Sequence, residues 1–448
     1  MSAPASRRVL VLGGGLAGLG AAWRLARAGL AVELLEREVA PGGRAAPAVL
    51  AGVEIDPAAH RVSTADRALR RLLSELGRER ELVAQSGEEC LQLQRGRLVA
   101  TPPADPFHVA RLPGVRPLQA LRLVRLARLL RQHASRLDPS APEKGVRLDD
   151  RSVGDFTRLY FGPSVLEGWI APALAADALA APEETSRLLF LLRHAARAEA
   201  SPARLAGGPG ALVRALAERL PIRLCAEALA LEFAGAGRLR VRLRGAVDAL
   251  EADAVVLALP ARAAARLAAP LLGAAEREFF AGARDAAAVT VAALLEGPRL
   301  PRSRHVVVSP GEGLPLLSLA IETGAPGGRL PEGHGLAVLL AGDAFARAHA
   351  GAPDEAVTKE LLAALARLQP DAVSGATRVF RWEAALPRFD VGRYRALERF
   401  QRVQRDRRAA GRRLYFAGDW LVDPSLEGAL VAGERAAAAV LEDLGFGS

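Results

Sequence analysis

The chain has 448 residues, of which 50% are hydrophobic and 25% charged, and its net charge is +10. This composition excludes a disordered protein and leaves room for about two domains. Aromatic residues make up only 4% of the chain and interleave with no basic stripe, so we expect no nucleic-acid partner. The 2 cysteines and 7 histidines show no ligand spacing, which predicts no metal site and a reducing compartment.

The first pattern along the chain is a strand, a glycine turn and a helix. Gly13 allows a tight turn out of the strand, Gly15 lets the backbone approach a pyrophosphate, and Gly18 lets the helix lie close to the strand. The helix opens at Leu16 and Ala17, where unpaired N–H groups attract phosphate.

A second strand follows and ends in an acid, Glu36, with Arg37 directly after it. Glu36 lies 23 positions after Gly13, close to the spacing at which a carboxylate accepts hydrogen bonds from ribose hydroxyls. Strand, turn, helix and acid in one register predict an adenine dinucleotide site, with Arg37 as a further candidate contact.

Pro41-Gly42-Gly43-Arg44 comes next. Here the sequence resembles the flavin-containing amine oxidase superfamily, which also includes phytoene desaturases, hydroxysqualene dehydroxylases and protoporphyrinogen oxidases. In that superfamily a Gly-Gly-Arg follows the ribose acid, and its arginine lies near the flavin phosphates. The resemblance implies FAD as the cofactor, with Gly42, Gly43 and Arg44 among its contacts; a loop with one solvated arginine is the alternative.

Residues 55–60 resemble the Asp-x-Gly-x-His segment of phytoene desaturases and hydroxysqualene dehydroxylases, although Ala58 replaces the usual glycine. The resemblance makes His60 a candidate catalytic residue that touches the flavin or acts as an acid. A structural role is the alternative, because a catalytic histidine needs both reach and a tuned pKa.

Residues 111–137 combine leucines and arginines at helical spacing. Leu123, Leu126, Ala127 and Leu130 form one stripe, and arginines share the other half with further leucines. Such a helix can lie on an anionic membrane with its arginines extended toward water; the alternative is a core-facing helix with a solvated side. We expect a cytoplasmic protein, with contact at the inner face of the membrane through 111–137 left open.

Two later segments extend the resemblance. Residues 223–231 match the strand whose backbone meets the adenine, which makes Ala228 a candidate contact. Near the C-terminus, superfamily members close the flavin site with a Gly-Asp or Gly-Glu strand end and a Glu-Gly-Ala helix start, where open N–H groups favour negative charge on the flavin. The matching residues here are Gly418, Asp419, Leu426, Glu427, Gly428 and Ala429.

Three substrate classes remain open. Gly418-Asp419-Trp420 and an apolar, small-residue substrate region favour an isoprenoid, whose binding is mainly burial of area. Residues 152–172 and 380–389 are similar to protoporphyrinogen oxidases, and Trp382 within them either lines the substrate cavity or belongs to the core. Amine oxidases usually place a lysine by the flavin, whereas Lys144 and Lys359 lie in polar contexts.

We therefore predict an α/β protein with a discontinuous, Rossmann-type FAD-binding domain (1–75, 205–265 and 405–448) and an α+β substrate domain (76–204 and 266–404). The predicted function is an FAD-dependent oxidoreductase that passes hydride from a large apolar substrate to flavin. An isoprenoid desaturase or dehydroxylase is the first expectation and a protoporphyrinogen oxidase the second. An amine oxidase or a non-catalytic flavin-binding protein is the remaining alternative, and the sequence specifies no oligomeric state.

Overall fold

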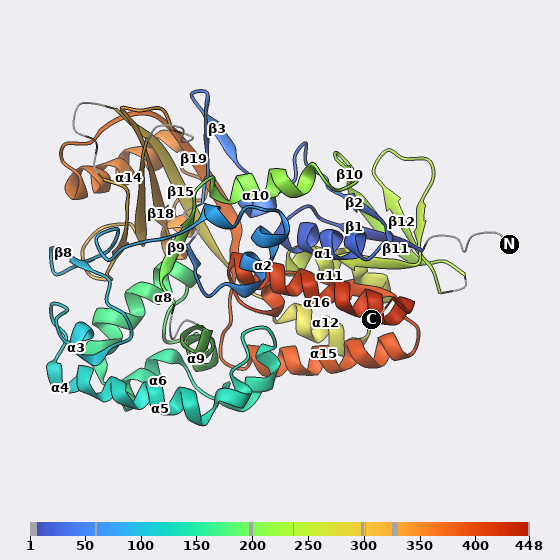
Figure 1. The fold of residues 1–448 in the computed structure, drawn as a ribbon, viewed down its shortest axis with the longest axis horizontal. Helices are drawn as coiled ribbons and strands as arrows, with labels where there is room; N and C mark the ends of the chain where they lie inside the picture. Colours follow the sequence, from blue (N-terminus) through green and yellow to red (C-terminus); the bar gives the residue numbers. More distant parts are fainter. Residues whose placement is uncertain are drawn as a thin grey trace.

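The computed structural model describes residues 7–58, 61–196, 200–235, 237–296, 300, 302–324 and 330–446. Figure 1 shows a parallel sheet with its helices at one end of the molecule and a larger mixed sheet at the other. A layer of helices runs along the side below both sheets in this view. Segments from both ends of the chain contribute to the parallel sheet, so residues distant in sequence meet there.

In the described part of the chain, five parallel strands form this sheet in the spatial order β10–β2–β1–β14–β20. Their bounds are β10 (Ile222–Arg223), β2 (Ala31–Leu35), β1 (Arg8–Leu12), β14 (Ala254–Leu257) and β20 (Leu414–Phe416). The central strands β1 and β14 are almost continuously apolar and buried. A parallel sheet covered on both faces requires that pattern.

The two helices that begin at this sheet pack against each other: α1 (Leu16–Arg27) and α16 (Leu426–Leu444). Gly433 of α16 permits the close approach, because a Cβ there would lie 2.3 Å from the carbonyl oxygen of Ala17. The other helices around the sheet are α2 (Arg67–Glu75), α10 (Gly208–Ala217), α11 (Ala261–Ala268), α12 (Ala274–Ala281) and α15 (Arg393–Ala409).

The mixed sheet has the order β19–β15–β18–β17–β16–β7–β8. Its strands are β19 (Val373–Pro387), β15 (Asp285–Glu296), β18 (His334–Ala341), β17 (Ser318–Thr323), β16 (Arg304–Val308), β7 (Cys90–Gln94) and β8 (Arg97–Ala100). Its pairs are antiparallel except for β16 and β7. Helix α14 (Asp354–Leu368) covers one face through Val357, Leu361 and Leu365, with α13 (Asp343–Ala348) beside it.

Smaller elements connect these layers. The short strands are β3 (Ala48–Leu50), β4 (Val53–Ile55), β5 (Val62–Ser63), β6 (Leu82–Ala84), β9 (Pro202–Leu205), β11 (Ala228–Phe233), β12 (Leu239–Leu243) and β13 (Leu250–Ala252). The helical layer contains α3 (Pro106–Val109), α4 (Pro117–Ala120), α5 (Val124–Gln132), α6 (Val153–Tyr160), α7 (Pro163–Val165), α8 (Ala171–Ala178) and α9 (Arg187–Ala196). A π-helical turn at Leu166–Ile170 joins α7 to α8.

The predicted α/β class with a Rossmann-type parallel sheet is confirmed. The predicted domain boundaries stay a prediction. The helix expected across 111–137 is interrupted, because α4 ends at Ala120 and a 3-10 turn precedes α5. Leu123 and Leu126 of the predicted stripe are buried, whereas Ala127 is exposed.

Candidate functional site

A cavity of about 1700 Å³ lies between the parallel sheet and the mixed sheet. Its wall includes the first glycine turn, the end of β2, the loop after it, the strands β15 and β19, and the start of α16. Ligand pockets are usually ~300–1,000 Å³, so this cavity has room for a dinucleotide and a second large molecule.

The glycine turn between β1 and α1 combines two tight contacts with one open position. A Cβ on Gly13, whose φ is +108°, would lie 2.5 Å from the carbonyl oxygen of Ala258. A Cβ on Gly18 would lie 1.9 Å from the carbonyl oxygen of Gly13, which confirms its close helix–strand packing. At Gly15 nothing lies within 4 Å, so the backbone is open toward the cavity that it lines. Phosphates can therefore approach Gly15 and the N-terminus of α1.

Glu36 is buried at the carboxyl end of β2 and held by two backbone groups. Its Oε2 accepts from the N–H of Gly14 at 2.6 Å and its Oε1 from the N–H of Glu38 at 2.9 Å. Each oxygen keeps a second lone pair, which ribose hydroxyls can use. Arg37 also lines the cavity and pairs with Glu38 at 2.9 Å.

The Gly-Gly-Arg segment packs directly on the first turn. The N–H of Gly42 donates to the carbonyl oxygen of Gly14 at 2.7 Å. Gly42 has a φ of +124°, and a Cβ there would lie 2.7 Å from Cα of Ala46, so a side chain cannot be accommodated. This packing brings the backbone of Gly43 beside Gly15 and fixes where the following arginine begins.

Arg44 joins the two ends of the chain. Its Nη2 donates to Oδ1 of Asp419 at 2.9 Å, across 375 residues of sequence, and its Nη1 donates to the carbonyl oxygen of Ala385 at 2.8 Å. Burial opposes the charge of Arg44, but the Asp419 carboxylate outweighs it and raises the guanidinium pKa above its ordinary value. Both side chains line the cavity, so the pair forms a fixed polar edge of its wall.

The start of α16 differs from the expectation in two residues. Leu426 and Ala429 line the cavity, but the N–H of Gly428 donates to Oγ of Ser425 at 3.0 Å, and a Cβ on Gly428 would lie 2.0 Å from the carbonyl oxygen of Asp423. Gly428 therefore serves helix capping and packing. The cap thus satisfies the N–H of Gly428. Among the first-turn N–H groups, those of Leu426 and Glu427 remain without an intrahelical partner.

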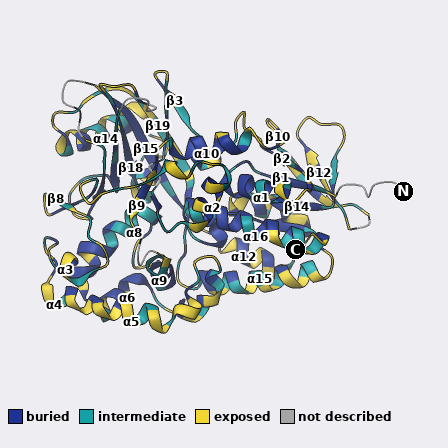
Figure 2. Cartoon of the chain, in the orientation of Figure 1, coloured by how far each residue is buried: buried dark blue, intermediate teal, exposed yellow. Residues whose placement is uncertain are grey.

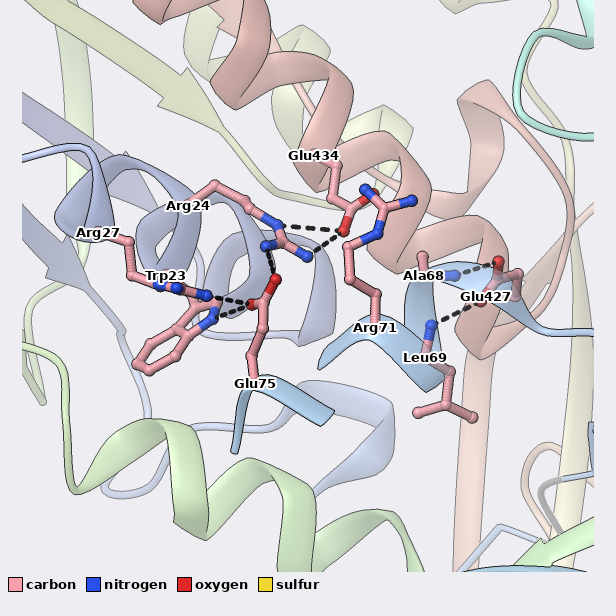
Figure 3. A network of polar contacts seen from close by, with 9 residues as sticks. All are labelled: Trp23, Arg24, Arg27, Ala68, Leu69, Arg71, Glu75, Glu427 and Glu434. Atoms are coloured by element: carbon pink, nitrogen blue, oxygen red, sulfur yellow. Dashed lines mark hydrogen bonds and ion pairs between the residues drawn. The ribbon is translucent and has the colours of Figure 1, made fainter. Parts of the chain in front are cut away.

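Glu427 is not among the residues that line the cavity, and its carboxylate caps α2 (Figure 3). Its carboxylate accepts from the N–H groups of Ala68 and Leu69 at 2.8 and 2.9 Å. Burial, together with the nearby carboxylates of Asp66 and Glu434, raises the pKa of Glu427 to about 7 against the opposing effect of the two N–H donors. The side chain thus connects the start of α16 to the start of α2.

The far end of the cavity is lined by small and apolar side chains of β15 and β19. Trp382 lines the cavity opposite Ala288, and its Nε1 donates to Oγ1 of Thr290 at 3.3 Å. Leu179, at the end of α8, packs against Ala288 and Trp382 while holding a φ of +50°. A leucine in this left-handed conformation is strained by about 1–2 kcal/mol, so the fold holds Leu179 at this wall against a backbone preference.

Charged side chains also line this cavity: two ion pairs, and beyond them Arg262, Arg266, Arg347, Arg381 and Glu383. Nη1 of Arg61 lies 2.6 Å from Oδ1 of Asp177, and Nε of Arg193 lies 2.8 Å from Oδ1 of Asp423. Asp285 also lines the cavity, and burial together with the charge of Asp419 raises its pKa.

Most of the predicted site residues surround this one cavity. Those that line it are Gly13, Gly15, Leu16, Ala17, Glu36, Arg37, Gly42, Gly43, Arg44, Ala228, Trp382, Gly418, Asp419, Leu426 and Ala429. Gly18, Glu427 and Gly428 lie outside the wall and support it through packing and capping. His60 lies outside the described residues, so its role stays a prediction.

Several wall residues were missed. Leu179, Arg61, Arg193 and Asp285 belong to no motif, and only the fold brings them to the cavity. The nearly continuous apolar run of β15 could have signalled a buried strand, but not which face meets a ligand. Among the described residues, no group of His, Cys, Asp and Glu is arranged to hold a metal ion. No helix in that part of the chain is long and apolar enough to span a bilayer.

A glycine-turn dinucleotide site closed by a Gly-Asp strand end defines a flavin-dependent oxidoreductase. The family of flavin-containing amine oxidoreductases matches residues 16–441, so the chain belongs to this family, and its cofactor is FAD. The curated relative Protoporphyrinogen oxidase 2, chloroplastic/mitochondrial, of Arabidopsis thaliana is 25% identical over 187 residues. That match covers 42% of this chain and 35% of the relative, so the chain matches about a third of the relative's length.

Several solved structures share the fold. A structure described as "Putative protoporphyrinogen oxidase" from Exiguobacterium sp. 255-15 has a TM-score of 0.75 and 20% identity, covering 99% of this chain and 100% of that one. A putrescine oxidase triple mutant has a TM-score of 0.76 and 20% identity, covering 98% and 99%. Cyclohexylamine oxidase from Brevibacterium oxydans IH-35A has a TM-score of 0.71 and 18% identity, covering 98% and 100%.

Proposed function

We propose that this FAD-dependent oxidoreductase oxidises a large apolar substrate, with an isoprenoid hydrocarbon or alcohol as the first candidate. The carrying observation is the wall of the cavity beyond the cofactor contacts. It contains Ala176, Leu179, Ala287, Ala288, Val289, Leu340, Trp382, Ala384 and Leu386. Such a wall binds by burying apolar area, at roughly 25 cal/mol per Å².

The pairing of two wall arginines supports the same proposal. The arginines at 61 and 193 are paired with Asp177 and Asp423, which reduces the positive potential that an anionic substrate would meet. The chain's two lysines are both on the surface: Lys144 pairs with Asp138 at 2.7 Å, and Lys359 is exposed on α14. A lysine beside the flavin, usual in amine oxidases, therefore has no counterpart in the wall.

The reaction needs little from the protein beyond position and electrostatics. FAD supplies the chemistry by accepting a hydride from a substrate carbon. The chain's own residues hold the cofactor through Glu36 and the Arg44–Asp419 pair, and the wall around Trp382 excludes water and orients the carbon to be oxidised.

Anaerobic reduction of the holoenzyme tests the proposal. An isoprenoid should bleach the absorbance of oxidised flavin, and a bulky A384F substitution in the wall should slow this bleaching without loss of FAD. The control A376F places the same side chain on the exposed part of β19, outside the wall, and should behave as the wild type. Equal bleaching rates in A384F and wild type would contradict this use of the cavity.

A porphyrinogen is the second candidate. It is favoured by the relative named Protoporphyrinogen oxidase 2 and by arginines within the wall, among them Arg61 and Arg193. If the Asp177 and Asp423 carboxylates yield to substrate carboxylates, Arg61 and Arg193 become their partners. In the same anaerobic assay, bleaching by protoporphyrinogen, lost in R61M and R193M, would replace the first candidate with the second. Bleaching by putrescine instead would contradict both.

A further inference from the structure

The helical layer carries an exposed surface that combines apolar side chains with arginines. Leu118 and Val124 are 79% and 62% exposed, and Phe107, Leu121 and Leu159 are also exposed. Figure 2 shows this exposure along α3, α4 and α5 at one edge of the molecule. We call the exposed face of residues 106–131, together with Leu159, the α3–α5 surface.

The charged side chains of the segment that carries this surface are of one sign, although Asp155, one turn before Leu159 on α6, is acidic and exposed. Residues 106–137 contain seven arginines and neither aspartate nor glutamate. Arg122 and Arg128 are exposed beside the apolar residues. Between α3 and the end of α5, therefore, no acidic side chain of the segment neutralises the arginines, and the surface attracts anions.

The exposed apolar side chains are not the ones that hold the segment in place. Ala120, Leu123 and Leu126 face inward and are at most 3% exposed, so they anchor α4 and α5 to the core. Leu118, Leu121 and Val124 are exposed instead. Apolar residues of this size gathered on one surface mark a contact with a partner or a membrane.

Helix α15 shows that arginine content alone does not produce such a surface. Arg393–Ala409 also holds seven arginines, but Glu398 and Asp406 lie among them. None of its described residues is a large hydrophobic side chain exposed to solvent. The α3–α5 surface is therefore distinguished by apolar side chains between unneutralised arginines.

We propose that the α3–α5 surface docks on an anionic phospholipid bilayer. The arginines contact lipid phosphates, each contributing about 1 kcal/mol, and the leucines, valine and phenylalanine enter the headgroup boundary. An acidic protein would satisfy the arginines, but it would not by itself call for apolar side chains interleaved with them. Docking through this surface does not depend on which substrate the enzyme oxidises.

The position of the surface fits an enzyme that takes its substrate from lipid. α5 packs on α9, and α8 and α9 contribute Asp177 and Arg193 to the cavity wall. The same helical layer thus forms both the docking surface and one side of the cavity. This step alone rests on the proposed apolar substrate.

Flotation of the holoenzyme with vesicles tests the docking. Vesicles of phosphatidylcholine mixed with phosphatidylglycerol should bind the wild type, raised salt should weaken binding, and pure phosphatidylcholine should bind little. R122E/R128E should lower the partition coefficient at least tenfold, because about 1 kcal/mol is lost for each arginine. L118S/V124S should also lower it, because it removes the apolar insertion.

Two control variants keep the test specific. R399E/R405E makes the same charge change at exposed positions of α15, and F233S/V247S makes the same apolar-to-serine change at exposed positions remote in sequence. Both should bind vesicles as the wild type does. If the wild type fails to bind anionic vesicles, the proposal is overturned. The same holds if it binds an acidic protein but not the vesicles. Equal losses in the R399E/R405E control would overturn it as well, by attributing binding to net charge.

Discussion

The cofactor end and the substrate end of the cavity are built in opposite ways. At the cofactor end, glycines remove side chains where backbones meet, as at Gly18, and the carboxylate of Glu36 is fixed by backbone N–H groups. At the substrate end, Leu179 keeps its side chain in a conformation that suits glycine. The first end conforms to a ligand common to the family, whereas the second positions a side chain that shapes this enzyme's own wall.

The largest expected effect separates the two kinds of glycine in the first turn. In G18A the new Cβ meets the carbonyl oxygen of Gly13, so the helix must shift, and we expect a loss of about 3 kcal/mol in the free energy of unfolding. In G15A the Cβ enters open space, so stability should change by less than about 0.5 kcal/mol while FAD affinity falls. Urea unfolding of the apoprotein and FAD titration measure the two quantities. Equal stabilities of G18A and G15A would contradict the distinction.

The sequence predicted the cofactor end well because its parts are contiguous. Residues 9–36 hold strand, turn, helix and acid within one unit, so spacing alone fixes their arrangement. It predicted Glu427 and Gly428 less well. Their side-chain positions depend on α2 and on Asp423, which come together only in the folded chain. Leu179 had no sequence signal, because its conformation and its contacts with the mixed sheet are both tertiary.

The Arg44–Asp419 pair tests whether the two chain ends meet at the cofactor. D419N removes a buried carboxylate that balances the partly exposed guanidinium of Arg44. We expect about 2 kcal/mol less stability, below the range for fully buried pairs because of that exposure. FAD should also bind more weakly. Chemical unfolding and FAD titration check both effects.

The matched control for this pair is E183Q. It breaks the ion pair between Arg158 and Glu183, whose side chains are 47% and 56% exposed. Its cost should stay below about 0.5 kcal/mol. If D419N is as stable as E183Q and its FAD affinity is unchanged, the Arg44–Asp419 pair does not contribute to FAD binding.

Glu427 predicts a pH dependence at the junction between α2 and α16. Because its pKa is raised from 4.5 to about 7, the folded chain binds the proton more tightly than the unfolded chain. The resulting stability is complete below pH 4.5 and is lost as the pH rises to about 7. In E427Q the change in the free energy of unfolding across this pH range should be smaller by about 1.5 kcal/mol, after allowance for partial exposure. E355Q, at an exposed position of α14, should leave the slope unchanged.

The smallest effect tests the strain at the substrate end. L179A and L179G remove the same packing, but only glycine relaxes the left-handed backbone, so L179G should be more stable than L179A by about 1 kcal/mol. At Leu174, buried inside α8, the order should reverse, with L174G less stable than L174A by about 1 kcal/mol. Denaturant unfolding of the four variants measures both differences. If L179G is less stable than L179A, as expected for the pair at Leu174, then Leu179 carries no strain. The contrast between the two ends of the cavity would then rest on composition alone.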